Sequence, residues 1–461
     1  MSLQHRLDLL CMSYAHRTPF AYKRIPMIAL LGLLTVQLSV QAAERDELTL
    51  YQALERTLQH SPAIQQQPLA MRQAALHRLA AAVTPPPEVA VNVSNLAGTT
   101  VHSRGLQAAE LSISFGQLLE HESKQVARIA QSEAATAALT AQHQVEQMEL
   151  LATTIRAYQQ VQYLQLLTDW TQQRLTTEQQ ILNSAAQRQA AAALLAADVS
   201  RLKLRVTLTQ QQLEQLHTDH QQARMTLAAL WGATPAFTRV ESLSSKPPQL
   251  PAWSAVFAQI QQSPQLHRWL STQRLADAER RLARVNQQND WRVEVGITRD
   301  QGLQNTSLSL SFSRPLAMSQ PQQLAQAELA VAQQELSNSL NQQQLQLRLS
   351  QLYQHLERQI SHLNSWQHQV IPQAEQFVSH SQQAWQQGLL STNDWLAARQ
   401  ELLQTERDWI DLRHAVALWW LELQLLSGHP LQQHPATSMM TAPALNSPSN
   451  AQAIPHLWSQ E

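Results

Sequence analysis

The chain has 461 residues, a formal net charge of −1 and only 5% aromatic residues. A net charge near zero provides no basic field that would attract nucleic acid and no acidic field for a basic partner. The sequence contains nine glycines and is dominated by Leu, Ala and Gln, a composition that favours helices.

The N-terminus has the pattern of an export signal. Lys23 and Arg24 precede the apolar run Met27–Val40, and small residues follow it. A positive flank, a short apolar core and small residues predict a secretory signal peptide that is cleaved near Ala42. A transmembrane anchor is the alternative, but about 14 apolar residues fall short of the roughly 20 that a spanning helix needs.

The only cysteine, Cys11, precedes the apolar core of this signal. The exported chain is therefore expected to contain no disulfide, no cysteine metal ligand and no acylated N-terminal cysteine. No later apolar run reaches the length of a membrane helix. Such an exported protein is periplasmic, secreted or an outer-membrane barrel.

The rest of the sequence contains an internal repeat. Leu48–Gly232 and Pro251–Gly428 share one order of motifs, and Ser61 in the first copy matches Ser263 in the second. A repeat that mixes short strands with very long helices restricts the architecture more than any single motif. The expected segments are a signal peptide and extension at 1–42, the first repeat at 43–232, a linker at 233–250, the second repeat at 251–428 and a flexible tail at 429–461.

A very long helical region is expected in the first repeat. Between Gln117 and Trp231 there is neither Gly nor Pro, and apolar residues recur at helical spacing. Because one rod of about 115 residues would reach about 170 Å, a hairpin of two rods is expected, with its turn within 176–197. Pro68 is expected to kink or interrupt the preceding helix. Asp198 is expected to cap the returning one.

The second repeat shows the same pattern with a more clearly marked turn. Helical spacing extends over Gln322–Ile371 and Gln373–Gln387. The turn is expected at Gly388–Asp394, where Thr392 or Asn393 would cap the next helix.

A soluble coiled coil is the plain interpretation of such helices. It would show unbroken heptads with charges flanking the apolar seam. Here charged residues are only 15% of the chain, and glutamine fills many of the polar positions. A polar, weakly charged helical surface suits a water-filled interior or a wall of packed helices.

Four short segments alternate apolar and polar residues, at 88–96, 109–116, 291–299 and 306–313. Period-two alternation predicts half-buried strands, here in two pairs. Two small soluble hairpins packed on helices are one explanation. The other is the wall of a membrane barrel, with its apolar face toward lipid. The candidate lipid-facing residues are Val89, Val91, Val93, Leu111, Ile113, Phe115, Val293, Val295, Ile297, Leu308, Leu310 and Phe312.

Four strands cannot close a barrel by themselves, and a structure that spans a membrane has no open edge in lipid. Several copies would therefore have to contribute strands to one barrel. Three copies would supply twelve strands, an even number within the known range.

Several motifs in order resemble the TolC-like outer-membrane efflux proteins, over about Leu48 to Gly428. Each motif is loose, and the specificity lies in their order, spacing and duplication. They are Leu48–Glu55, Thr226–Gly232, Pro372–Gln376, Trp385–Gly388, Asn393–Arg399 and Leu425–Gly428.

The resemblance implies a mainly α fold with a small β part. Each chain of a homotrimer would give four strands to a 12-stranded outer-membrane β-barrel and long helical hairpins to a periplasmic tunnel. The implied function is that of a passive exit duct in a tripartite efflux system of a Gram-negative bacterium. A periplasmic adaptor would join the duct to a proton-driven inner-membrane transporter, and the duct itself would carry no cofactor.

The exported compound is left open between metal cations and other small toxic compounds. After the second expected strand, Glu120–Arg128 resembles loosely, through Lys124 and Arg128, a run found in the cobalt–zinc–cadmium type of heavy-metal efflux proteins. The glycines of that run are missing here.

The resemblance also implies a gate at the periplasmic end of the tunnel. Asp394 matches an aspartate that forms a cation-sensitive ring, and Trp385 and Gly388 match the turn beside it. Three copies of Asp394 around one axis would repel each other and attract cations. Ala397 replaces a second aspartate of the family, and Leu390 stands where a basic residue is expected. The alternative role for Asp394 is that of a helix cap.

The two repeats differ at this turn. Trp385 and Gly388 in the second copy are matched by Gln189 and Ala192 in the first. A moving gate is therefore expected in the second copy.

Metal and enzyme chemistry find little support. Among the 18 histidines, His217 and His220 share a helical face, but a pair without a third ligand is usually a solvated surface. The sequence contains no catalytic or nucleotide-binding motif, so no enzymatic activity is expected. The competing class is a soluble periplasmic coiled-coil scaffold or adaptor.

Overall fold

The computed structural model describes residues 47–95, 98–99, 104–105, 109–191, 194–242, 248–301, 304–315 and 321–428. The expected signal peptide and tail, and part of the linker, lie outside the described residues. In this part of the chain, no helix has the length and hydropathy of a membrane-spanning helix.

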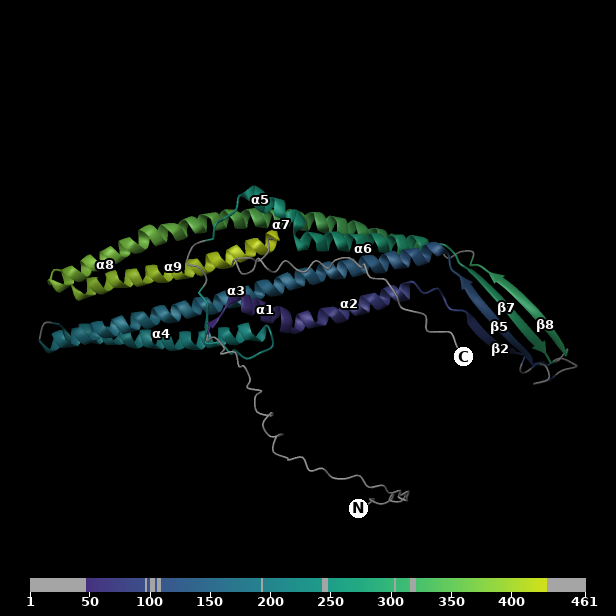
Figure 1. Cartoon of the computed structure of the whole chain (residues 1–461), viewed down its shortest axis with the longest axis horizontal. Helices are drawn as coiled ribbons and strands as arrows, with labels where there is room; N and C mark the ends of the chain where they lie inside the picture. The colour runs from purple at the N-terminus through teal and green to yellow at the C-terminus, as the bar shows by residue number, and fades with distance from the viewer. Residues whose placement is uncertain are drawn as a thin grey trace, which may run out of the picture. The chain divides into compact units, whose positions relative to one another are not determined.

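Each repeat folds into a short helix, a helix, two strands and a long helical hairpin (Figure 1). In the first repeat these are α1 (Leu50–His60), α2 (Pro62–Ala81), β2 (Glu88–Ser94), β5 (Glu110–Leu119), α3 (Glu122–Ala190) and α4 (Ala196–Ala229). In the second they are α5 (Trp253–Gln259), α6 (Pro264–Asn286), β7 (Trp291–Asp300), β8 (Asn305–Ser313), α7 (Pro321–Ser365), α8 (Ile371–Gln386) and α9 (Thr392–Ser427).

The helix α3 is unbroken over 69 residues, as the absence of Gly and Pro allows. It ends inside the expected range of the turn, and α4 begins at Ala196. We name residues 191–195 the first hairpin turn and residues 387–391 the second.

Of the two outcomes expected for Pro68, a kink or an interruption of the first helix, the interruption is wrong. The helix α2 passes through Pro68, and the break lies earlier, at Ser61 between α1 and α2. Ser61 is buried and extended, and Pro62 follows at the first position of α2, where a missing N–H costs nothing. The second repeat breaks in the same way, at Ser263 before Pro264.

The long outgoing helix of the second repeat is interrupted where α3 is not. A π-helical segment, Trp366–Val370, separates α7 from α8. It ends two residues before Pro372, whose ring nitrogen cannot donate a hydrogen bond and whose ring would clash with the carbonyl four residues earlier in a regular helix. The wider π turn accommodates the proline without ending the rod.

The four long strands form one antiparallel sheet in the order β2-β5-β7-β8. Its register aligns the expected lipid-facing residues in rows: Val91 pairs with Ile113, Ile113 with Ile297, and Ile297 with Leu308. On the other face, Ser114, Gly296 and Ser309 align in the same way. An added Cβ at Gly296 would lie 2.9 Å from the Ser309 hydroxyl and 3.1 Å from the Ser114 Cβ, so neighbouring side chains would have to shift.

The helices pack around α3. Near the strands α3 lies between α2 and α6, and α6 in turn packs against α7. Beyond the middle of the hairpins α3 packs against α4 and α9, and α9 packs against α8. Two layers of four helices therefore follow one another along α3, in the orders α2-α3-α6-α7 and α4-α3-α9-α8 (Figure 1).

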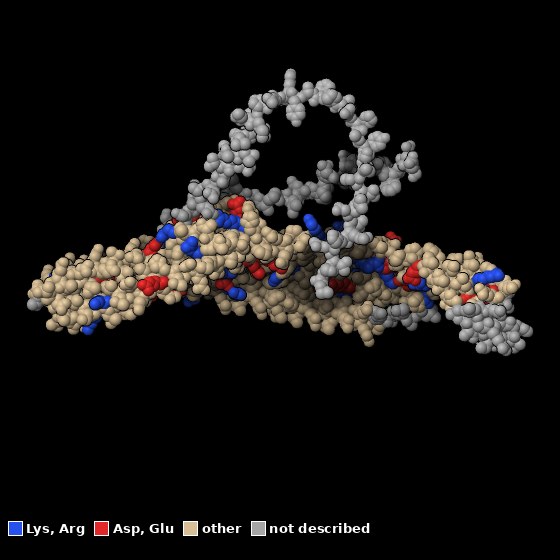
Figure 2. Space-filling view, turned by 90° about the horizontal axis from the view of Figure 1, so that it is seen from below, with Lys and Arg blue, Asp and Glu red and all other residues tan. Residues whose placement is uncertain are grey.

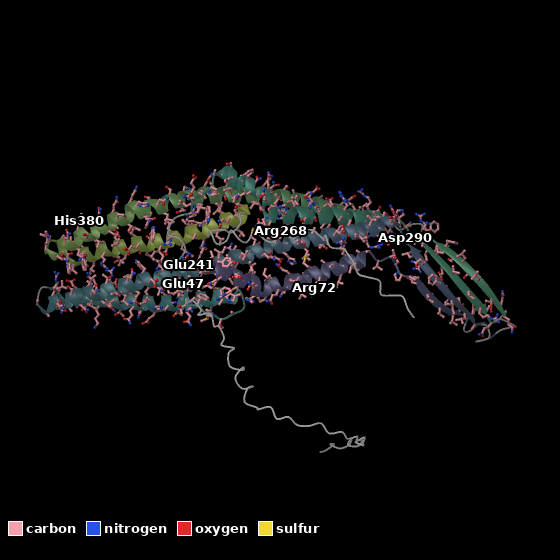
Figure 3. All side chains as sticks on the ribbon, viewed as in Figure 1. Glu47, Arg72, Glu241, Arg268, Asp290 and His380 are labelled. Carbon is pink, nitrogen blue, oxygen red and sulfur yellow. The ribbon has the colours of Figure 1, made fainter. Side chains whose placement is uncertain are left out.

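The start of the described chain is fixed to the middle of α3. Two short strands, β1 (Glu47–Leu48) and β6 (Arg239–Val240), pair in parallel. The fully buried Tyr158 hydroxyl lies 2.9 Å from the Leu48 carbonyl oxygen and 3.0 Å from that of Glu241, and burial raises its pKa. Glu47 and Glu241 lie near each other beside this contact (Figure 3).

A polar joint connects the strands to the helices. Lys124 in the first turn of α3 donates to Asp290, just before β7, at 2.6 Å, and the two side chains are largely buried. The His121 backbone N–H donates to the same carboxylate at 3.2 Å. Asp290 thus ties the second repeat to the first where sheet and helices meet (Figure 3).

Candidate functional site

The second hairpin turn has a well-defined backbone. Gly388 adopts a positive φ of 75°, which a residue with a side chain adopts only with strain. No atom lies within 4 Å of an added Cβ, so the backbone angle rather than space requires this glycine. Hydrogen bonds from Gly388 N to Trp385 O and from Leu389 N to Ala384 O complete a Schellman motif that ends α8.

The cap of α9 is Ser391, not Thr392 or Asn393 as the sequence predicted. The Ser391 hydroxyl accepts a hydrogen bond from the Asp394 N–H at 3.1 Å and donates to the Asp394 carboxylate at 2.6 Å. This reciprocal pair satisfies a free N–H of the first turn of the helix. Asp394 therefore has a local structural role, and its side chain is otherwise exposed.

Among the described residues of the first hairpin turn, neither device is present. Leu195 stands at the N-cap of α4 and makes no side-chain hydrogen bond there. Asp198 lies in the first turn of that helix, so the expectation that it is the cap is wrong.

Two indole rings form the centre of the second hairpin turn. Trp385 in α8 stacks on Trp395 in α9, with ring centroids 4.4 Å apart and planes 9° from parallel. The Trp385 ring nitrogen donates to the Thr392 hydroxyl at 3.1 Å, which orients the ring. Trp395 is 2% exposed and packs with Leu396, Ala185 and Leu202, so the stack joins both hairpins.

Two arginines of the first repeat reach this turn. The Arg188 guanidinium lies 4.3 Å from the centroid of the Trp385 ring, a cation–π contact. Arg201 donates to the Asn393 side chain. Leu390, where the resemblance placed a basic residue, is instead packed in the apolar cluster. The basic side chains at this turn thus come from the other hairpin.

A buried charge cluster lies further along the same helices. Glu178 accepts from Arg174 at 2.8 Å and from the Thr209 hydroxyl at 2.6 Å, and it lies 3.5 Å from Arg205. Arg399 on α9 adds a third guanidinium to this region, and burial lowers its pKa. The cluster holds α3, α4 and α9 in a fixed relation below the turn.

A second set of polar contacts joins the hairpins at their middle. The Tyr163 ring on α3 stacks on His414 of α9 at 4.3 Å, and its hydroxyl donates to Asp411 at 2.7 Å. Arg407 also donates to Asp411 at 3.1 Å. Burial lowers the pKa of His414, which favours the neutral imidazole in this stack.

The strand wall places the twelve candidate lipid-facing residues on one face of the sheet. Val91 is 64% exposed, Ile297 57% and Leu308 75%, and most of the others are also exposed, so the single chain leaves a contiguous apolar face uncovered. Charged side chains lie sparsely scattered on the face seen in Figure 2. At the helix end of the wall, the Arg314 guanidinium lies 5.3 Å from the centroid of the Trp291 ring, a cation–π contact.

His217 and His220 do not form part of a metal site in the described residues. Burial lowers the pKa of His220, and its Nε2 atom is buried without a partner. Within the described ranges, no three His, Cys, Asp or Glu side chains come together as a metal site would require.

Sequence analysis found Trp385, Gly388 and Asp394 but missed Arg188, Arg201 and Ser391. The arginines come from the other repeat, so no local pattern marks them. Trp395 was quoted in a motif without a role, although two tryptophans flanking a short turn are a signal for a stacked pair.

No family model and no curated protein matches the sequence. Solved structures do match. CusC aligns with a TM-score of 0.70 at 14% identity, over 82% of this chain and 92% of that chain, and is described as forming a transmembrane channel. VceC, an outer membrane protein from Vibrio cholerae, aligns with a TM-score of 0.67 at 17% identity over 82% and 96%.

The outer membrane channel CmeC from Campylobacter jejuni aligns with a TM-score of 0.68 at 10% identity, over 82% of this chain and 85% of that chain. At these identities the likeness establishes the fold. The chain has the fold of TolC-like outer-membrane channels. The predicted fold class, mainly helical with a four-stranded contribution to a wall, is thereby confirmed.

Proposed function

We propose that the protein is a homotrimeric outer-membrane exit channel of a tripartite efflux system. The duct is passive: a proton-driven inner-membrane transporter supplies the energy, and a periplasmic adaptor joins the two. The cargo is a metal cation or another small toxic compound. The observation that carries the proposal is that, in the described residues, the outermost strands of the sheet and the outermost helices next to them each leave one side without a partner.

The sheet has two such edges. Within the described residues, β2 and β8 each pair on one side only, and both are long strands with an apolar face. Open edges of this kind are not tolerated in lipid. Pairing β8 of one copy with β2 of the next would close a ring, and three copies would make a barrel of twelve strands.

The helix layer next to the sheet also has two open sides, on α2 and on α7. The outer helices α2 and α7 each expose a stripe of apolar residues. On α7 the stripe is Leu329, Leu336, Leu340 and Leu347; on α2 it is Leu69, Leu76 and Leu79, followed by Val83 just beyond the end of the helix. Contact between α7 of one copy and α2 of the next would bury both stripes along the line that also joins β8 to β2.

The second hairpin turn is proposed as the gate. Three copies of Asp394 would meet near the axis and form a ring that holds cations. Trp385 and Gly388 shape the turn that carries Asp394, and Arg188 and Arg201 attach it to the first repeat. Opening would require these contacts between the hairpins to be released.

Assembly can be tested with a charge placed in the stripe. Leu336→Lys changes a side chain that is 61% exposed in the single chain, so the protomer should fold normally. The trimer should dissociate in detergent, because the new ammonium would be buried against α2 of the next copy. Gln342→Lys, at an exposed position of the same helix that points away from the stripe, is the control and should remain trimeric. The measurement is mass by light scattering.

Two outcomes would contradict the proposal. A wild-type protein that fractionates as a soluble periplasmic monomer would support the coiled-coil scaffold instead. A Leu336→Lys trimer as stable as that of the control would show that α7 does not lie at the interface.

The gate has its own test in planar bilayers. Asp394→Ala should reduce cation selectivity and weaken block by divalent cations, whereas Asp198→Ala should change neither. Because the Asp394 carboxylate also accepts a hydrogen bond from Ser391, the Asp394→Asn variant separates charge from hydrogen bonding: its amide oxygen can still accept that bond, and the ring charge is lost. Unchanged selectivity in both Asp394 variants would remove this residue from the gate.

A further inference from the structure

A groove lies between α3 and α6, just below the strands. Its volume is about 600 Å³, and its floor is apolar, formed by Val126, Ala127 and Ala130 of α3 with Ala278 and Val285 of α6. Val126 is 58% exposed although it occupies this hollow. Arg281 and Arg284 of α6 border the groove with exposed side chains.

The groove opens on the lipid side of the sheet and not on its polar side. A separate cavity at the same level is lined by Lys124 with Leu118 and Arg292, two residues of the row opposite the lipid-facing one. On α3, Lys124 precedes Val126 by two residues and so projects from nearly the opposite side of the helix. The groove of Val126 and the cavity of Lys124 therefore lie on opposite faces of the helix layer.

The groove also lies at the level of a membrane surface. Its first lining residues, His121 and Glu122, follow the end of β5 at Leu119 by two and three residues. Leu119 is 51% exposed and pairs with Trp291, the aromatic residue at the helix end of the wall. A headgroup layer extends roughly 5–7 Å beyond the hydrocarbon core. That distance covers the first helical turns of α3.

A neighbouring copy of the chain is not the occupant. The edges left open for assembly are on α2 and α7, whereas this groove lies between the two middle helices of the layer. The occupant must instead match an apolar floor with cationic groups at its border.

Phosphate chemistry fits those groups. Arg281 has no ion pair within the described part of the chain, and the Arg284 guanidinium approaches Glu328 only to 3.8 Å, with both side chains exposed. Glu122 is the one acidic side chain that lines the groove, against two arginines. A guanidinium recognises a phosphate oxygen through strong, charge-assisted hydrogen bonds.

We propose that this groove binds one glycerophospholipid of the inner leaflet, with an acyl chain along Val126, Ala130 and Ala278 and the phosphate at Arg281 and Arg284. The inference rests on the proposed outer-membrane location. Three such sites in a trimer would attach the helical part of the channel to the membrane surface.

The test uses the full-length protein in vesicles of phosphatidylethanolamine and phosphatidylglycerol, with a trace of phosphatidylglycerol that carries a photoreactive diazirine on one acyl chain. After irradiation, labelled peptides are mapped by mass spectrometry. Label is expected on the lipid-facing strands and on peptides containing 126–130 and 278–285. The double variant Arg281→Gln/Arg284→Gln should lower the groove label about tenfold, equivalent to about 1.4 kcal/mol. Arg274→Gln, an exposed arginine of the same helix outside the groove, should leave it unchanged.

A second variant fills the site without touching the arginines. Ala130→Trp places an indole in the groove at an exposed position and should abolish its label while the strands remain labelled. Strands that are labelled beside an unlabelled groove, or groove label that persists in both variants, would overturn the lipid site alone. Strands without label would overturn the membrane location, and with it the proposed function.

Discussion

The two hairpin turns occupy equivalent positions in the repeat, yet they are built differently. The second has a glycine with positive φ, a serine cap and a pair of stacked tryptophans. In the first, α3 ends at Ala190 and α4 begins at Ala196, and the N-cap residue Leu195 makes no side-chain hydrogen bond. The duplicated plan thus preserved the hairpin and concentrated the specific contacts in one copy.

This difference separates two tasks. The first turn only has to reverse the chain, and many sequences do so between long helices that are fixed by their own packing. The second turn also fixes Asp394 through Ser391 and contacts the first repeat through Arg188. In the gate proposed above, these are the contacts that opening would release.

The largest difference between the turns is expected on removal of Trp395. Trp395→Ala should lower the free energy of unfolding by about 3–5 kcal/mol, because the ring is buried and stacked. Val199→Ala, the matching change in the first repeat, affects a partly exposed side chain and should cost well under half as much. Guanidinium unfolding of both variants measures this. Equal losses would mean that the second turn is no more specifically packed than the first.

The ends of the two repeats offer the next contrast. Gly232 and Gly428 both have positive φ, so alanine at either position should cost about 1–2 kcal/mol. At Gly428 an added Cβ would also lie 2.7 Å from the Ser263 Cα, whereas at Gly232 nothing lies within 4 Å. Gly428→Ala should therefore be the more destabilising by about 1–3 kcal/mol of overpacking. Thermal unfolding of the two variants measures this difference in stability. A Gly232→Ala variant as unstable as Gly428→Ala would contradict the expected overpacking at Gly428.

A smaller effect is expected at the helix caps. Ser391→Ala removes a side-chain cap and should destabilise the protein by about 1 kcal/mol. Leu195→Ala, at the equivalent position of α4, removes no hydrogen bond and should have little effect. Hydrogen exchange of the first turns of α9 and α4 reports each cap separately, and equal exchange rates in the two variants would count against the asymmetry.

The smallest effect concerns pH. Burial lowers the pKa of His414 below its ordinary value of 6.5, so below that value the unfolded chain binds a proton that the folded chain resists. The contribution of His414 to stability should be complete above about pH 6.5 and decline as the pH falls toward the folded pKa. His414→Gln should flatten this decline in unfolding measured between about pH 7 and 5, and His380→Gln, at an exposed position, should not. An unchanged slope in His414→Gln would show that this histidine does not cause the decline in stability.

The elements themselves were predictable because they depend on local pattern. The absence of Gly and Pro predicted α3, and alternation predicted the strands of Val91 and Ile297. The break at Ser61 was misplaced to Pro68 because a proline inside a helix is a strong local signal, whereas a buried serine at a helix junction is not.

The contacts at the second hairpin turn were only partly predictable. Trp385 and Gly388 stand out in their own segment, but Arg188 and Arg201 lie about two hundred residues away on another hairpin. Their partners are determined by how the hairpins pack, and no period or motif records that. The helix cap depended on which of three adjacent polar residues took the extended conformation, a matter of a single backbone angle.

The π-helical segment before Pro372 has a mechanical consequence. At 1.5 Å per residue, α3 is an unbroken rod of about 100 Å. The outgoing helix of the second repeat is instead interrupted by the π-helical segment, about 24 Å from the second hairpin turn. In the gate proposed above, a force applied near Asp394 would meet this interruption in the second repeat after a short distance, whereas α3 of the first repeat has no such interruption. The first repeat would then be the rigid frame, and the second repeat would be the part that moves.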